Sequence, residues 1–343
     1  MHGVVPVPLL GRGDGERQIR LKASQGVRQN PPAGIPKAIT AALAAAFHDA
    51  PARPDGTLAP YTCSNTTCHR NTRTVCGTPR ARATGWRPHG VEEERMDWRE
   101  VIDELEAGVE RIVGTLSGLG DQDMRAPSGL PGWSRGHVAT HIARNADSLW
   151  NLLESARTGV EIPQYPSLDA RNADLDAGAG RSRDELAEDV RATAARFVEA
   201  ARALPEETWN VPVKSMLGWP HPAWYTLYRR WHEVEAHHVD LAAGYGPADW
   251  PEPYVRWALG STLTDIAALP EGRRGELDGL RITATDYGES ADLGWTPGGP
   301  EASGSGRALL GWLSGRSDGV GVSLRPDGPL PVPPPWPHEP TGF

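Results

Sequence analysis

Hydrophobic side chains recur every three or four residues over four segments of the chain, and this spacing predicts an amphipathic helix in each. The segments run from Asp97 to about Leu116, from Arg135 to about Arg157, from Ser182 to about Leu204 and from Pro222 to Ala243. Residues 160–181, between the second and the third, are polar and rich in Gly and Ala, and we expect them to form a flexible loop. Four such helices with one long crossover predict a four-helix bundle.

Residues typical of helix starts stand at the beginning of three of these segments. Ser134 precedes the second helix as a candidate N-cap, because its side-chain oxygen can accept a bond from a free backbone N–H. Ser182 and Glu185 have the spacing of a capping box at the third helix. Pro222 stands at the first position of the fourth helix, where a proline is favoured. These local signals agree with the hydrophobic pattern.

The pattern changes after residue 248, so the fold class that we predict is α+β. We expect the bundle over residues 96–248, a smaller α+β domain over 249–328 and a Pro-rich tail over 329–343. The smaller domain should contain a helix, a strand, a short helix and a strand, over Pro253–Leu269, Leu280–Asp286, Ser305–Leu313 and Val320–Leu324 in that order.

Residues 1–95 are rich in Pro, Gly, Arg and Thr, and we predict a mostly disordered N-terminal extension. Cys63, Cys68, His69 and Cys76 lie there, but their spacing fits no common zinc finger, and we favour inert cysteines over a metal site. A further hypothesis is that this extension is upstream sequence read through from an early start, because the first helical pattern begins right after Met96.

Composition and charge exclude several classes of function. The net charge of −9 over 343 residues argues against a general nucleic-acid binder, which would carry a basic surface. No apolar run reaches 18 residues and no secretory signal is recognisable, so we expect a cytoplasmic protein without a membrane partner. All three cysteines precede Met96, so any thiol chemistry in the bundle must use a thiol supplied from outside.

Candidate metal ligands gather on the second and fourth predicted helices. Glu233 and His237 lie four residues apart in the segment Arg-Trp-His-Glu-Val-Glu-Ala-His-His-Val-Asp, so they share one helix face. His137 and His141 are likewise four apart on the second helix. The most economical site takes His141 with Glu233 and His237, and leaves a fourth position open, as in catalytic zinc sites. His137 remains the alternative ligand, although it stands nearer the start of its helix.

Two other metal motifs fail on spacing. His232 and Glu233 begin a pattern like His-Glu-x-x-His, but His237 follows one residue too late for the zincin geometry. Glu235 and His238 form one Glu-x-x-His, whereas a di-iron carboxylate site needs that motif twice and two further glutamates. We therefore reject both interpretations.

Two stretches of the bundle resemble a known family. Leu-Pro-Gly-Trp-Ser-Arg-Gly-His-Val-Ala-Thr-His-Ile-Ala at 130–143, together with 230–241, is similar to the mycothiol-dependent maleylpyruvate isomerases of the DinB-like four-helix-bundle superfamily. The resemblance implies a divalent metal, usually zinc, on His141, Glu233 and His237. The chain departs from many members at His232, where they have a second Arg, and this leaves Arg230 as the candidate anion-binding residue. Residues 312–318 are similar to the sterol-carrier-like C-terminal domain of that family.

The resemblance also implies a reaction. Mycothiol, held as a thiolate by the metal, would add to the cis double bond of maleylpyruvate, and rotation followed by elimination would give fumarylpyruvate. Arg230 and Arg144 are the candidates for orienting the substrate carboxylates. A mycothiol-dependent S-transferase acting on another electrophile and a non-catalytic ligand-binding protein are the alternatives. The expected partners are a small-molecule substrate and a low-molecular-weight thiol, and we expect a monomer or a homodimer.

Overall fold

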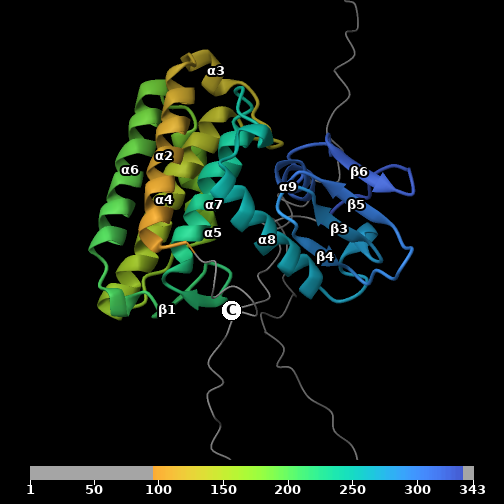
Figure 1. Cartoon of the computed structure of the whole chain (residues 1–343). Helices are drawn as coiled ribbons and strands as arrows, with labels where there is room; N and C mark the ends of the chain where they lie inside the picture. The colour runs from red at the N-terminus through yellow and green to blue at the C-terminus, as the bar shows by residue number, and fades with distance from the viewer. Residues whose placement is uncertain (1–95, 335–343) are drawn as a thin grey trace, which may run out of the picture. The chain divides into compact units, whose positions relative to one another are not determined.

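The computed structural model describes residues 96–334, all of which belong to one compact unit. The predicted N-terminal extension, its cysteine cluster and the end of the Pro-rich tail lie outside these residues. Secondary structure is mixed, with a helical part followed by a smaller part that contains a sheet, so the α+β class is confirmed (Figure 1). Of the helices described, none combines the length and the apolar composition needed to cross a bilayer.

Four long helices build the helical part. They are α2 (Trp98–Ser117), α4 (Arg135–Thr158), α6 (Arg183–Ala203) and α7 (Tyr225–Asp240). Helices α2 and α4 each pack against both α6 and α7, so every helix turns its apolar face to a shared core. A short helix, α3 (Asp121–Arg125), precedes α4. The hydrophobic periodicity of the sequence therefore identified the four main helices.

The predicted helix caps are present. The Ser134 hydroxyl accepts a bond from the backbone N–H of His137 at the start of α4. Ser182 and Glu185 form the reciprocal capping box at the start of α6. Asp97 caps α2 by accepting from the backbone N–H of Arg99. The caps at Ser134 and Ser182 form within three residues, which is why sequence spacing could locate them, whereas the Asp97 cap was not predicted.

The predicted flexible loop over 160–181 is wrong, because it contains helix α5 (Leu168–Gly178), which packs on α4. Glycines allow this close approach. A Cβ on Gly136 would lie 2.2 Å from the backbone oxygen of Ala179, and one on Gly178 would lie 2.3 Å from the Thr140 methyl carbon. The small residues that suggested flexibility are required by packing instead.

The fourth helix also starts later than expected. Pro222 belongs to strand β2 (Pro220–Pro222), which pairs antiparallel with β1 (Pro212–Lys214) after a 3-10 turn, η1 (Glu206–Thr208). Helix α7 begins only at Tyr225. A proline is tolerated in an edge strand because its missing N–H need not enter a ladder. Pro222 therefore does not begin the fourth helix, as the sequence predicted. It ends strand β2, three residues before α7 begins.

The C-terminal part combines helices with a four-stranded sheet. Its elements are η2 (Pro247–Asp249), α8 (Glu252–Ala268), η3 (Gly275–Leu277), β3 (Arg281–Ala284), β4 (Ser290–Asp292), β5 (Glu301–Gly304), α9 (Gly306–Leu313) and β6 (Val322–Arg325). The strand order is β4-β3-β5-β6, with β3 and β5 parallel and the other pairs antiparallel. The predicted helix, strand, helix and strand correspond to α8, β3, α9 and β6. Strands β4 and β5 were missed because their sequences, Ser-Ala-Asp and Glu-Ala-Ser-Gly, contain none of the β-branched or aromatic residues that mark a strand.

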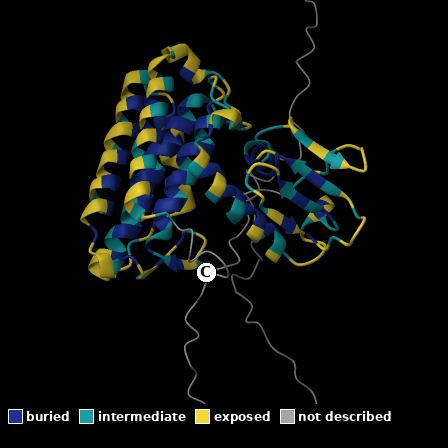
Figure 2. Cartoon of the chain, in the orientation of Figure 1, coloured by how far each residue is buried: buried dark blue, intermediate teal, exposed yellow. Residues whose placement is uncertain are grey.

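Burial follows the inward faces of the helices, as Figure 2 shows in dark blue. Most of the buried side chains on α4 and α7 are apolar, but several are polar or charged. Those discussed below are His141, Arg230, Glu235, His238 and Asp240. Buried polar groups need partners inside the protein, and their concentration on α4 and α7 makes this region a candidate functional site.

Candidate metal centre

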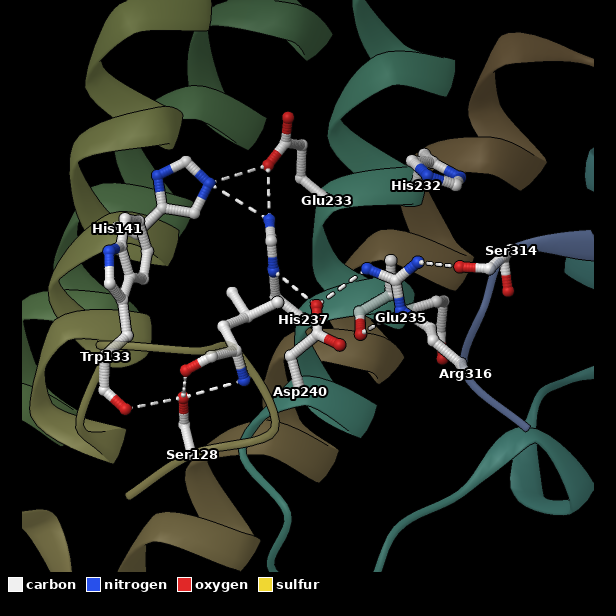
Figure 3. Close-up of polar contacts among 12 residues, drawn as sticks. Ser128, Trp133, His141, His232, Glu233, Glu235, His237, Asp240, Ser314 and Arg316 are labelled. Carbon is white, nitrogen blue, oxygen red and sulfur yellow. Dashed lines mark hydrogen bonds and ion pairs between the residues drawn. The ribbon is translucent and has the colours of Figure 1, made fainter. Parts of the chain in front are cut away.

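Helices α4 and α7 bring His141, Glu233 and His237 together (Figure 3). The Nε2 atom of His141 lies 3.0 Å from Oε2 of Glu233 and 3.0 Å from Nε2 of His237. Glu233 Oε2 and His237 Nε2 are 3.1 Å apart. The i, i+4 spacing on α7 sets the Glu233–His237 contact, and the packing of α4 on α7 adds His141. We call these three residues the triad.

The triad fits a divalent ion. Its three donor atoms form a nearly equilateral triangle with sides of 3.0, 3.0 and 3.1 Å. Two ligand atoms of a tetrahedral zinc ion, each about 2.0–2.1 Å from the metal, lie about 3.3 Å apart. The triangle is therefore close to one face of a zinc coordination tetrahedron. Two imidazoles and one carboxylate are also the donor types that zinc prefers, with the fourth corner left for a ligand.

Electrostatics divide the three groups into different protonation states. Burial and the neighbouring His237 lower the pKa of His141 to about 4. Burial alone would lower the pKa of His237, but Asp240 and Glu233 outweigh it and raise that pKa to about 9. Burial opposes ionisation of Glu233, yet the bonds from both histidines hold its pKa well below the usual value. At neutral pH, His237 is therefore the triad residue in its protonated form, while His141 is neutral and Glu233 is ionised. A bound cation would replace the extra proton on His237.

The outer nitrogens of the two histidines have partners as well. His237 Nδ1 lies 2.9 Å from Oδ2 of Asp240, and this oxygen is 2.7 Å from Arg316 (Figure 3). A carboxylate on Nδ1 fixes the tautomer that leaves Nε2 free to bind a metal. Arg171 Nη2 is 3.4 Å from His141 Nδ1. Asp240 ended the stretch singled out in the sequence, and its position three residues after His237 was a signal that we did not use.

His137 does not join the triad. Its Nδ1 accepts the backbone N–H of Ser134 at 3.2 Å and lies 2.7 Å from the Ser134 hydroxyl, so the ring completes the cap of α4. Its Nε2 is 3.6 Å from Asp176. His141, one turn later, faces α7 and is covered edge-on by Trp133, with ring centroids 5.6 Å apart. Of the two alternatives, the geometry groups His141 with the candidate ligands.

The two predicted substrate-orienting arginines have partners within the helical part. Arg230 is buried and donates from Nη1 to the Ile142 backbone oxygen at 2.7 Å and to Asn145 at 2.9 Å, which ties α7 to α4. Arg144 Nη2 pairs with Asp189 at 2.6 Å and with Asp147 at 3.2 Å. In the described part of the chain neither guanidinium hydrogen-bonds to the triad, so their role toward a substrate stays a prediction.

Arg171 and Arg229 are the cationic neighbours that we did not identify from the sequence. Arg171 is buried on α5, the helix that we took for a loop, and approaches His141 as described above. Arg229 precedes Glu233 by one helical turn on α7, and burial lowers its pKa while Glu233 opposes that shift. Arg229 donates to Gln164 at 3.2 Å and lies 4.9 Å above the Trp219 ring. The contact of Arg171 with His141 depends on α5, a segment distant from His141 in sequence, whereas the i, i+4 spacing of Arg229 and Glu233 was a signal already present in the sequence.

A cavity of about 670 Å³ lies between the segment after α4 and the β1–β2 hairpin, and neither the triad nor Arg171 or Arg229 is among its lining residues. Gln164 and Tyr165 line one side of it, and Ser215 and Met216 line another. Gln164 connects this wall to α7 through its bond with Arg229. The volume is within the range of small-molecule sites.

Another polar cluster lies between α7 and α2. Glu235 is fully buried and pairs with Arg111 at 2.5 Å and with the Tyr245 hydroxyl at 2.7 Å. His238 lies 2.8 Å from the Thr115 hydroxyl and stacks on Tyr245 with ring centroids 3.7 Å apart. Glu235 and His238 are thereby engaged with α2, away from the contacts of the triad.

The comparisons with known proteins all point to one family. Residues 105–242 match the family model described as the mycothiol maleylpyruvate isomerase N-terminal domain. The structure is similar to the crystal structure of the mycothiol-dependent maleylpyruvate isomerase, with a TM-score of 0.63 and 29% identity over 70% of this chain and 98% of that one. A histidine-to-alanine mutant of the isomerase gives a TM-score of 0.63 and 28% identity over the same shares. No curated protein matches. The helical part of the chain is therefore similar to the N-terminal domain of the mycothiol-dependent maleylpyruvate isomerases.

Proposed function

We propose that this protein is a metal- and mycothiol-dependent cis–trans isomerase that converts maleylpyruvate to fumarylpyruvate. The observation that carries the proposal is the meeting of His141, Glu233 and His237 in a chain that covers 98% of a solved isomerase of this name. We propose zinc as the divalent ion, because the donors and their spacing fit its tetrahedral preference.

The substrate and the product have the same atoms, and the thiol is regenerated at the end of the reaction. The thiolate sulfur forms a bond to one carbon of the cis double bond, and the π electrons move into the adjacent carbonyl. The former double bond is then a single bond and can rotate. Return of the electrons re-forms the double bond in the trans geometry and expels the thiolate. A divalent ion bound by the triad would supply a lowered pKa for the thiol, so that the thiolate is available at neutral pH.

The residues of the chain have separate tasks in this proposal. Glu233 provides negative charge and one ligand atom, while Asp240 holds His237 with Nε2 toward the other ligands. Arg171 and Arg229 supply the positive charge that would orient the two carboxylates of maleylpyruvate, since guanidinium groups bind carboxylates through paired N–H donors. The cavity beside Gln164 would accommodate the rest of the thiol cosubstrate.

The finer assignments from the sequence also stay proposals. We propose that residues 96–248 form a DinB-like bundle and that 249–328 form a sterol-carrier-like domain. We further propose a cytoplasmic protein that acts as a monomer or a homodimer. Its partners in this proposal are a small-molecule substrate and a low-molecular-weight thiol.

The deciding experiment measures maleylpyruvate loss by the zinc-loaded full chain with and without mycothiol. We expect thiol-dependent turnover that disappears in Glu233→Ala. The matched control is Glu188→Ala, because Glu188 is an exposed carboxylate on α6 that pairs only at the surface with Arg191. Zinc-loaded protein without turnover would refute the isomerase reaction and favour S-transfer to another electrophile. A chain that binds no zinc would favour a non-catalytic binding protein.

A further inference from the structure

The C-terminal part contributes a side chain next to the metal centre. Arg316, in the loop after α9, donates from Nη2 to Asp240 Oδ2 at 2.7 Å and from Nε to the Ala236 backbone oxygen at 3.2 Å (Figure 3). A third bond, from Nη1 to the Ser314 oxygen at 3.4 Å, connects it to its own loop. The side chains of Arg316 and Asp240 are each only 7% exposed, so water screens their pairing weakly.

Asp240 connects this arginine to the triad. The same carboxylate oxygen that receives Arg316 also faces His237 Nδ1 at 2.9 Å. Asp240 therefore bridges Arg316, in the C-terminal part, and the candidate ligand His237 by hydrogen bonds at one oxygen. Among the bonds described here, the one from Arg316 to Asp240 leads directly to a candidate ligand, so we expect its effect on His237 to pass mainly through the carboxylate.

The position of Asp240 explains why it needs this partner. Asp240 is the last residue of α7, where the free carbonyl groups make the helix end negative. A buried carboxylate at that end is unfavourable unless a cation balances it. Arg316 supplies the cation and also bonds the Ala236 carbonyl in the last turn. With both contacts in place, the carboxylate is held at the distance from His237 that fixes the imidazole tautomer.

We propose that Arg316 is a positioning residue of the metal centre, which orients His237 through Asp240 and makes the C-terminal part necessary for full metal affinity. The inference rests on the part of the proposed function that assigns a divalent ion to the triad, and it does not depend on which reaction follows. Partners that orient metal-bound histidines change metal affinity by about 10- to 100-fold when they are removed. Arg316 acts one contact further out, so we expect an effect near the lower limit.

The test measures zinc affinity of the full chain by competition with a chromophoric chelator. We expect Arg316→Gln to weaken zinc binding about tenfold and Asp240→Asn to weaken it at least as much. The double variant should bind no more weakly than Asp240→Asn alone, within about twofold, because the two residues act in series. The matched control is Arg135→Gln. Arg135 also bonds the end of α7, at the Leu241 and Ala242 oxygens, but donates to backbone only, so this variant should keep wild-type affinity.

Unfolding of the metal-free variants separates positioning from simple stabilisation. Arg316→Gln leaves the buried Asp240 without its cation, so its thermal midpoint should fall further than that of Arg135→Gln, which loses partly exposed bonds to backbone. At a temperature well below both midpoints, where both variants are folded, zinc affinity should fall for Arg316→Gln alone. If Arg316→Gln does not fold, Arg316→Lys replaces it. A lysine keeps the charge, but its single nitrogen cannot reproduce the two-nitrogen contact with Asp240 and Ala236, so intermediate zinc affinity is expected.

Two results would overturn the proposal. One is wild-type zinc affinity in Arg316→Gln, and the other is a double variant whose loss equals the product of the two single losses. A wild-type chain that binds no zinc would overturn both this inference and the metal in the proposed function. Zinc binding that weakens as expected, in a protein without isomerase activity, would support the role of Arg316 while the proposed reaction fails.

Discussion

Binding of a divalent ion to the triad should release about one proton per ion at pH 7.5. The proton comes from His237, whose pKa is raised to about 9 in the metal-free protein. A group with that pKa is mostly protonated at pH 7.5, and it must lose its proton before Nε2 can bind a metal. His141, with its pKa lowered to about 4, is already neutral and contributes no proton.

The same pKa values set the sign and range of the pH dependence of affinity. Raising the pH removes the competing proton, so zinc binding should strengthen about tenfold per pH unit between about pH 5 and pH 8. The dependence should flatten above about pH 9, where His237 is neutral without metal. Below about pH 4 it should steepen, because His141 then also takes up a proton.

Calorimetric titration of the metal-free chain with zinc, repeated in buffers of different ionisation enthalpy, gives the number of protons released. Asp240→Asn serves as the comparison, since it removes a carboxylate that raises the pKa of His237. Its proton release at pH 7.5 should fall below one, whereas protons from a metal-bound water would still appear. Zero release by the wild type at pH 7.5, with affinity that does not change between pH 6 and pH 8, would refute the reasoning.

Three further predictions concern packing, the second polar cluster and the substrate. Gly136→Ala should lower stability by about 1–3 kcal/mol through overpacking, while Gly180→Ala, with open space at its Cβ, should not; chemical denaturation compares the two. Glu235→Ala should lower the free energy of unfolding by about 2 kcal/mol, less than for a fully buried ion pair because the side chain of Arg111 is 34% exposed. Its zinc affinity should stay within about twofold of the wild type. Arg171→Gln should lower kcat/KM for maleylpyruvate about 10- to 100-fold without loss of bound zinc, and equal kcat/KM in variant and wild type would contradict its role. Arg191→Gln, at an exposed ion pair, is the control for that assay and should match the wild type.

The sequence by itself determined the features that depend on neighbours within one or two helical turns. The periodicity of apolar residues located α2, α4, α6 and α7, because a helix places residues three and four apart on one face. The spacing of Ser182 and Glu185 located a cap for the same reason. The pairing of Glu233 with His237 also follows from i, i+4 geometry alone, so two of the three triad residues could be paired before any packing was known.

Tertiary structure alone decided the features that depend on which faces meet. His137 and His141 lie four residues apart on α4, so helix periodicity places both on one face. The packing of α4 on α7 brings His141 to Glu233, whereas His137 completes the cap of α4. Helix α5 was hidden because its polar and small residues indicated a loop, although its glycine, Gly178, serves close packing on α4, and Arg171 was hidden with it. Asp240 and Arg316 lie 76 residues apart and meet through contact between the helical and C-terminal parts. Such contacts join chain segments through long-range packing, which local periodicity and spacing do not encode.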